Sequence, residues 1–116
     1  MYQPGGSRAD TMTQMTSLHE ERLDFVFTTI RATGARTVLD LGCGSGSLLY
    51  RLLADDQFER VTGLEDSGVS LRQARSVLEK FLNEDPCRIQ LVHGSYAERN
   101  PALTGFEAAA MVETIE

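Results

Sequence analysis

A glycine-rich turn with an acidic residue in front of it carries the strongest chemical signal in the sequence, Asp40-Leu41-Gly42-Cys43-Gly44-Ser45-Gly46. Glycines at alternate positions let backbone N–H groups approach a ligand closely, because no Cβ stands in the way. A helix that begins directly after such a turn presents its positive end to an anionic group. The segment therefore predicts a turn that binds a ligand carrying an anionic group.

Two common phosphate-binding turns do not fit these residues. The dinucleotide fingerprint G-x-G-x-x-G/A, counted from Gly42, fails because its last position is Ser47. A P-loop requires Gly-Lys followed by Ser or Thr, and the only lysine of the chain is Lys80. What is left is an acidic residue two positions before a G-x-G-x-G turn.

A second acidic position follows the next apolar run. Glu65 lies 19 residues beyond Gly46, a placement from which a carboxylate can accept both hydrogen bonds of a ribose diol. Asp66 is its neighbour, so the sequence leaves open which of the two carboxylates faces a ribose. The alternative interpretation of both motifs is a tight turn between a strand and a helix, with solvated carboxylates.

Apolar patterning predicts the elements that position these residues. Four short β-rich runs are expected to form strands, at 37–41, 61–64, 89–92 and 106–112. Helical spacing predicts a helix after the glycine turn, over 48–53, and another that Ser67 caps and that continues to Leu82. Because strands and helices alternate, the expected fold class is α/β, with a parallel sheet covered by helices on both faces.

The N-terminal region divides into two parts. Residues 1–16 are polar, rich in Gly, Ser and Thr, and lack periodicity, so they are expected to be a disordered arm or a tag remnant. Ser17 and Glu20 have the spacing of a capping box, which predicts a helix that begins there and ends at Gly34. The folded domain is accordingly expected to comprise residues 17–116.

Composition narrows the class of protein. The 116 residues allow one domain at most, and 17 acidic against 11 basic side chains give a net charge of −6. That charge argues against a surface that grips nucleic acid throughout, although a local basic site remains possible. The sequence contains two cysteines and neither a membrane-spanning run nor a signal peptide, so a cytoplasmic protein without a membrane partner is expected.

The acidic residue, the glycine turn and the second acidic position together resemble motif I and its surroundings in class I S-adenosylmethionine-dependent methyltransferases. The resemblance implies a Rossmann-like fold in which the first acidic residue holds the methionine end of S-adenosylmethionine and the second acidic position faces its ribose. Ser95, after the third predicted strand, occupies the place that contacts the adenine, where many relatives have Asp. The implied cofactor residues are Asp40, Gly42, Cys43, Gly44, Gly46, Glu65, Asp66 and Ser95.

Further stretches resemble a narrower family, the catalytic domain of small-RNA 3′-terminal 2′-O-methyltransferases. They are 18–23, 94–103, 105–109 and 112–116, so the resemblance covers the chain from Leu18 to Glu116. It implies transfer of a methyl group to the 2′-OH of the 3′-terminal ribose of small RNAs, with the RNA 3′ end as the partner.

The narrower resemblance also implies a metal site. In that family the fourth strand ends in a Glu-x-x-Glu-His run that binds a divalent metal, and Glu113 and Glu116 match its two carboxylates. They are the implied catalytic residues and ligands of Mg²⁺ or Mn²⁺, a hard cation that would lower the pKa of the 2′-OH. On spacing alone, two such glutamates after a strand are the solvated start of a helix.

The point at which the sequence ends affects the activity that we expect of this chain. The resemblance implies a fold truncated after the fourth strand, as a shortened chain, a partial gene model or a natural fragment. We expect these 116 residues to bind the cofactor weakly, if at all, and not to methylate RNA alone. Two alternatives stay open: a methyltransferase acting on a small molecule or a protein, and a non-catalytic nucleotide-binding module. The oligomeric state is not fixed by the sequence, although an uncovered fourth strand favours self-association.

Three reactive side chains receive structural interpretations. Cys43 is expected to be a small turn residue rather than a nucleophile, since no histidine stands at a suggestive position. His19 and His93 are single histidines, for which a surface or packing role is expected.

Overall fold

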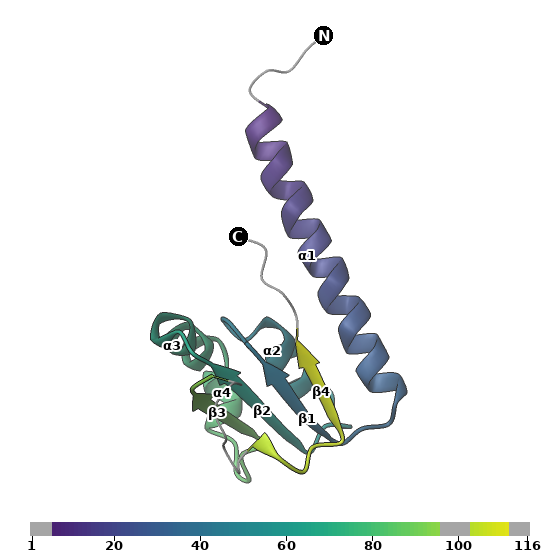
Figure 1. The fold of residues 1–116 in the computed structure, drawn as a ribbon, viewed down its shortest axis with the longest axis vertical. Coiled ribbons are helices and arrows are strands. Elements are labelled where there is room, and N and C mark those ends of the chain that lie inside the picture. Colours follow the sequence, from purple (N-terminus) through teal and green to yellow (C-terminus); the bar gives the residue numbers. More distant parts are fainter. Residues whose placement is uncertain (1–5, 96–102, 112–116) are drawn as a thin grey trace.

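A four-stranded parallel sheet forms the centre of the computed structural model, which describes residues 6–95 and 103–111, with side chains from residue 18 onward. The strands stand in the order β3-β2-β1-β4 and are β1 (Thr37–Leu41), β2 (Arg60–Glu65), β3 (Ile89–His93) and β4 (Ala108–Met111) (Figure 1). The predicted α/β class and the first three strands are confirmed. The fourth strand begins at Ala108, two residues later than predicted, and its predicted end at Val112 lies outside the described residues.

Within the described residues, four helices accompany the sheet: α1 (Gly6–Ala32), α2 (Ser47–Leu53), α3 (Gly68–Val77) and α4 (Glu79–Leu82). The chain moves from β1 to β2 to β3 in one direction, so right-handed crossovers place α2 and α3 on the same face of the sheet. In the part of the chain that the structure describes, the helices gather on that face (Figure 1). The expectation of helices on both faces is therefore not confirmed within these residues.

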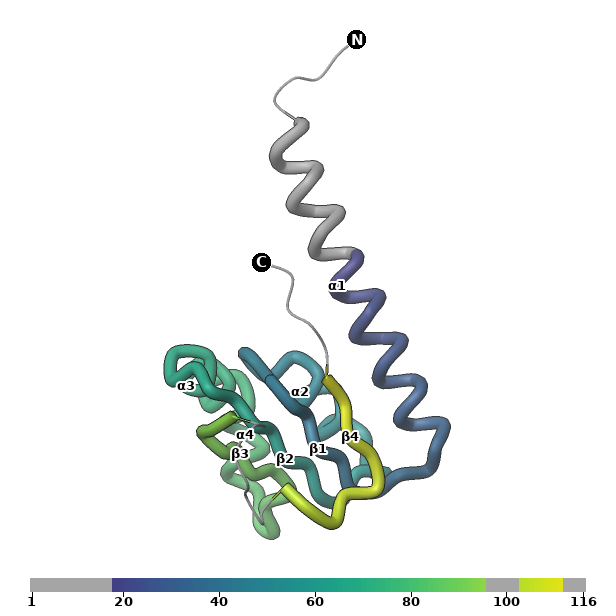
Figure 2. Tube along the Cα trace, in the orientation of Figure 1, coloured from purple at the N-terminus to yellow at the C-terminus, as the bar shows by residue number. Residues whose placement is uncertain are grey.

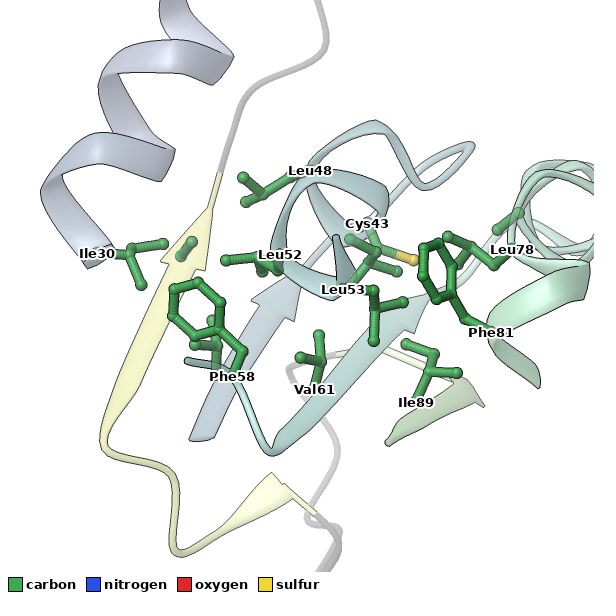
Figure 3. Packing of buried hydrophobic residues seen from close by; sticks show 14 of the residues in the cluster. Ile30, Cys43, Leu48, Leu52, Leu53, Phe58, Val61, Leu78, Phe81 and Ile89 are labelled. Carbon is green, nitrogen blue, oxygen red and sulfur yellow. The ribbon is translucent and has the colours of Figure 1, made fainter. Parts of the chain in front are cut away.

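One apolar cluster joins the helices to the sheet. Val38, Val61 and Ile89 stand side by side in register on the three strands, and all three are buried. Leucines of α2 and Phe81 of α4 point toward them in Figure 3. These apolar residues form the core beneath the sheet. The carboxyl ends of β1 and β2 are instead lined by polar groups.

The first helix is attached to this core by its C-terminal half. Leu23 and Ile30 are buried in the cluster, and Phe27 packs edge-on against Phe58 with 6.2 Å between ring centroids. The guanidinium of Arg51 on α2 also forms ion pairs with Glu20, at 2.8 Å, and with Asp24. These contacts fix α1 beside α2.

The predicted start of the first helix is wrong. The first helix begins at Gly6, so residues 6–16 belong to it and Ser17 lies inside it rather than at its N-cap. No proline or glycine follows Gly6 until Gly34, and therefore nothing in the backbone chemistry stops the helix at Ser17. The expected disordered arm is thus not confirmed over 6–16, whereas residues 1–5 lie outside the described part.

The predicted helix through Leu82 is interrupted. Ser67 caps α3 as expected, because its Oγ accepts a hydrogen bond from the Ser70 N–H at 3.2 Å. Leu78 then leaves the helical region with φ −100° and ψ 12°, and the chain continues as α4. Leu78 is fully buried, and this bend keeps both it and Phe81 in the core.

Residues distant in sequence meet where β4 joins β1. Figure 2 traces the chain back to the free side of β1 after it has passed through β3. Glu107 fixes this return, since its Oε1 accepts the Arg36 N–H at 2.8 Å and its N–H donates to Thr37 Oγ1 at 2.9 Å. Leu41 therefore pairs with Met111, and both strands end at the same edge of the sheet.

Candidate functional site

A cavity of about 410 Å³ lies at the carboxyl ends of β1 and β2. In open parallel sheets ligands bind at this edge. Its lining comes from α1, the β1–α2 turn, α2, the end of β2 and α3: His19, Leu23, Asp40, Gly42, Cys43, Gly44, Ser45, Ser47, Leu48, Glu65, Asp66, Ser67, Ser70 and Gln73. Six of the eight predicted cofactor residues are thus gathered around one space.

The glycine turn is held against the end of β2. The N–H groups of Gly42 and Cys43 both donate to the Leu64 carbonyl, at 2.8 and 2.9 Å. Gly42 and Gly44 have φ of +72° and +56°, and a Cβ built on either would meet nothing within 4 Å. Glycine is therefore required at these two positions for the left-handed backbone, and the space beside the turn stays open.

Gly46 ends the glycine turn, as predicted, and its cofactor-binding role stays a prediction. It precedes α2 rather than lining the cavity, and a Cβ at this position would lie 3.3 Å from Leu78 Cδ1 and 3.4 Å from Ala74 Cβ. Its structural role is the close approach of α2 to α3.

Asp40 is a buried carboxylate with an unused oxygen. Its side chain is 2% exposed, and Oδ1 has no hydrogen-bond partner among the described residues. Burial, together with the nearby charge of Glu65, raises the pKa of Asp40 to about 7. A buried polar atom without a partner is costly, so this oxygen is suited to a donor or a cation that enters the cavity.

Glu65 connects the glycine turn to the start of α3. Its Oε1 accepts the Gly44 N–H at 2.7 Å, and its Oε2 accepts the Ser67 N–H at 2.9 Å. A carboxylate has about four acceptor positions, so Glu65 keeps capacity for further donors. Asp66 is exposed and also lines the cavity. Both carboxylates therefore remain candidates for a ribose, with Glu65 the more firmly placed.

A smaller cavity of about 60 Å³ shares Gly42 and Asp66 with the first and is lined further by Leu64, Gly94 and Ser95. Ser95 is thus placed next to the cofactor residues predicted on β1 and β2. His93 Nε2 lies 3.0 Å from the Asp66 backbone oxygen. This contact joins the ends of β2 and β3, in keeping with the structural interpretation of His93.

Cys43 is a turn residue as expected. It is 8% exposed, and burial followed by the charges of Asp40 and Glu65 raises its pKa to about 12. The protonated thiol is a poor nucleophile. Gly63 on β2 lies below it, and a Cβ there would approach Cys43 Sγ to 3.0 Å and Leu49 Cδ1 to 2.6 Å. Close packing of the turn on β2 therefore depends on Gly63.

The structure adds residues to the cavity that the sequence did not predict as cofactor residues. His19, interpreted as a surface or packing residue, lines the cavity from α1, and Ser67, Ser70 and Gln73 line it from α3. The N-cap signal could have placed Ser67 near the site, whereas only the packing of α1 brings His19 there.

The predicted metal ligands cannot be placed in this geometry. Glu113 and Glu116 both lie outside the described residues. Among the residues that are described, no cluster of three or more His, Cys, Asp or Glu side chains could hold a metal ion. The metal site therefore stays a prediction.

Comparison with known proteins finds similarity to methyltransferases. A family model described as a methyltransferase domain matches residues 38–116. A small RNA 2′-O-methyltransferase of Arabidopsis thaliana is 30% identical over 117 residues, covering 97% of this chain and 12% of that protein. One of Mus musculus is 29% identical over 105 residues, covering 85% of this chain and 27% of that protein.

Solved structures agree with these matches. The methyltransferase domain of bacterial CtHen1 is 35% identical with a TM-score of 0.75, covering 84% of this chain and 51% of that one. The small RNA methyltransferase HEN1 is 30% identical with a TM-score of 0.72, covering 82% and 12%. S-adenosylmethionine-bound CalS10, an amino pentose methyltransferase, is 27% identical with a TM-score of 0.65, covering 98% and 44%. The chain thus spans about half of the CtHen1 domain and at most 28% of the first curated relatives.

Proposed function

Because the chain belongs to the methyltransferase domain family, we propose that it forms the cofactor-binding part of an S-adenosylmethionine-dependent RNA methyltransferase. Its fold is the Rossmann-like class I methyltransferase fold, and its resemblance to small RNA 2′-O-methyltransferases extends over most of the chain. The proposed unit comprises residues 17–116, since Leu23 and Ile30 of α1 belong to the same core as the residues of the family match.

The single observation that carries the proposal is the unpartnered Asp40 oxygen in a cavity of about 410 Å³. Small-molecule sites typically have volumes of roughly 300–1,000 Å³. S-adenosylmethionine, when bound, supplies an electrophilic methyl group on a positively charged sulfur. Asp40 would hold its ammonium group, Glu65 would accept the ribose hydroxyls, and Asp66 and Ser95 would lie beside the adenine. The donors of this ligand match the acceptors that the cavity offers.

The proposed methyl acceptor is the 2′-OH of the 3′-terminal ribose of small RNAs. Support comes from the small RNA methyltransferases at 30% identity and from the position of β4, whose Met111 pairs with Leu41 at the edge that bears the cavity. Glu113 and Glu116 follow Met111 closely in sequence. Carboxylate oxygens suit Mg²⁺ or Mn²⁺, so we propose that these two residues hold a divalent ion that activates the 2′-OH.

A second candidate is methyl transfer to a small molecule, favoured by the likeness to an amino pentose methyltransferase. The non-catalytic nucleotide-binding module remains the alternative without chemistry.

We propose the cytoplasm as the location. Cys43 and Cys87 are both free thiols, and a reducing compartment maintains thiols in that state. None of the described helices is both long and apolar enough to cross a membrane.

Calorimetric titration of the chain with S-adenosylmethionine tests the cofactor assignment. Asp40→Asn is expected to weaken binding about tenfold or more, because it removes the charge that pairs with the ammonium group. Asp56→Asn, at an exposed position outside the cavity lining, is the matched control and is expected to leave the affinity unchanged. Equal affinities of Asp40→Asn and the unmodified chain would contradict the assignment.

Radiolabelled cofactor tests the acceptor, with the gene product that contains this chain and two RNAs that end in a 2′-OH or a 2′-O-methyl ribose. Label is expected only in the RNA with the free 2′-OH, and chelation of divalent metal is expected to abolish it. Equal labelling of both RNAs would rule out the terminal ribose as the acceptor.

A further inference from the structure

The charges that line the large cavity are unbalanced. Three carboxylates face it, from Asp40, Glu65 and Asp66, and His19 is the one lining side chain among the described residues that can become positively charged. No Lys or Arg belongs to the described lining. From this arrangement, and resting on the proposed function, we infer that His19 binds the α-carboxylate of the cofactor's methionine part and so selects ligands that carry it.

The ligand's own charges require such a partner. S-adenosylmethionine carries a positive sulfonium, a positive ammonium and a negative carboxylate. The protein carboxylates suit the two cations and the ribose hydroxyls, but they repel the ligand carboxylate. A cationic donor close to Asp40 would add to the N–H groups of the glycine turn, so that the ammonium and the carboxylate of one amino acid are both paired by charge. A hydrogen bond from a cationic donor to a carboxylate is stronger than one between neutral groups.

The fold brings His19 to the correct end of the cavity. α1 lies on the β4 side of β1, and α3 lies beside the other half of the sheet (Figure 1). The lining residues of α3, including Ser67 and Ser70, stand with Glu65 at the ribose end. α1, which bears His19, is thus on the β4 side of β1, which bears Asp40, and both residues line the cavity.

Neighbouring contacts hold His19 in this place. Leu23, one helical turn farther along, is 4% exposed and lines the same cavity. Glu20 is ion-paired with Arg51 on α2 at 2.8 Å, and Asp24 is paired with the same guanidinium. Because these anchors surround His19 on α1, its half-buried ring is presented to the cavity by a fixed helix. Such pre-positioning lowers the entropy lost when a ligand is bound.

A thermodynamic cycle tests the inference with two ligands, S-adenosylmethionine and its decarboxylated form, which lacks only the α-carboxylate. The unmodified chain is expected to bind S-adenosylmethionine the more tightly. His19→Ala is expected to lose about tenfold in affinity for S-adenosylmethionine and less than twofold for the decarboxylated ligand. Glu21→Ala, at an exposed position of the same helix, is the control and is expected to change neither affinity.

The outcomes separate this inference from the proposed function. If His19→Ala weakens both ligands equally, or weakens neither, His19 does not bind the carboxylate and the inference is wrong. If the unmodified chain binds neither ligand, the proposed function fails and the inference fails with it. His19→Gln keeps a neutral donor and is expected to retain part of the discrimination; it completes the cycle if the alanine variant does not fold.

Discussion

Asp40 shows how a residue proposed to bind the cofactor can lower the stability of the unliganded protein. Its carboxylate is buried at 2% exposure beside Glu65, and its Oδ1 lacks a partner among the described residues. The folded chain therefore holds the Asp40 proton to a higher pH than the unfolded chain does. A ligand that supplies the missing donor would also relieve this cost of a buried carboxylate.

The pKa of Asp40 predicts a specific dependence of stability on pH. The pKa is about 7 in the folded chain against 3.8 as the ordinary value. Since the folded state binds the extra proton, its contribution to the free energy of unfolding is present below pH 3.8 and is lost as the pH rises through about 7. Asp40→Asn is expected to remove this loss and to stabilise the unliganded chain at pH 8 by about 1–4 kcal/mol.

Urea unfolding at pH 5 and pH 8 measures this effect as the difference between the variant and the unmodified chain. Asp56→Asn provides the background change, because Asp56 is exposed. Parallel pH profiles for Asp40→Asn and the unmodified chain would show that burial of this carboxyl does not perturb its titration.

Among the elements, α2 has one side chain that caps its C-terminal end in addition to the backbone hydrogen bonds of Ala54 and Asp55. Arg88, just before β3, donates through Nη1 to the Phe58 carbonyl at 2.8 Å and through Nη2 to the carbonyl of Leu53, the last residue of α2. Carbonyls at a helix end have no partner within the helix, and a guanidinium satisfies several of them at once. Arg88 thereby joins α2, the following loop and β3.

Replacement of Arg88 by Met is expected to lower the free energy of unfolding by about 1–3 kcal/mol, because it leaves these carbonyls without their donor. Arg88→Lys is expected to recover only part of the loss, since an ammonium lacks the planar fork. Guanidinium-induced unfolding followed by circular dichroism measures both variants. Arg75→Met, at an exposed position of α3, is the control, and a loss of the same size in that variant would argue against a specific role for Arg88.

The positions of helices, strands and turns were predictable from the sequence where local residue chemistry determines them. The β-branched run of β1, the glycine turn and the Ser67 cap all lie where the sequence places them. The start of α1 was not predictable from its capping signal, because a Ser17–Glu20 spacing also occurs inside a longer helix. The break at Leu78 follows from burial against the sheet, which periodicity alone does not contain.

Some residues of the candidate site were likewise predictable from the sequence, and others were not. Asp40 and Glu65 were predictable, because the carboxyl ends of neighbouring parallel strands must meet. His19 was not, since its place depends on how α1 docks through Leu23 and through the ion pairs to Arg51. Gly46 has the spacing of a turn residue but contacts Ala74 and Leu78, which are brought to it by the tertiary fold.

At the scale of the whole molecule, the sheet has an edge that is suited to pairing. Within residues 6–95 and 103–111, β4 is hydrogen-bonded to β1 alone, and its outer face exposes Ala109 together with Met111, which is 56% exposed. Glu107 and the Arg36 N–H hold this strand flat against β1. An apolar edge strand without a charged residue is a template for pairing with a second copy.

The chain is therefore expected to self-associate, against the repulsion of its net charge of −6. Because salt screens that repulsion over about 10 Å at 0.1 M, the average mass measured by sedimentation should rise with protein concentration and with added salt. Ala109→Lys places a charge on the exposed face of β4 and is expected to keep the chain monomeric. Gln90→Lys adds the same charge to an exposed position of β3, at the other edge of the sheet, and serves as the control. If both lysine variants reduce association equally, added charge is responsible rather than the β4 edge; if the unmodified chain is monomeric at high salt, the edge does not pair at all.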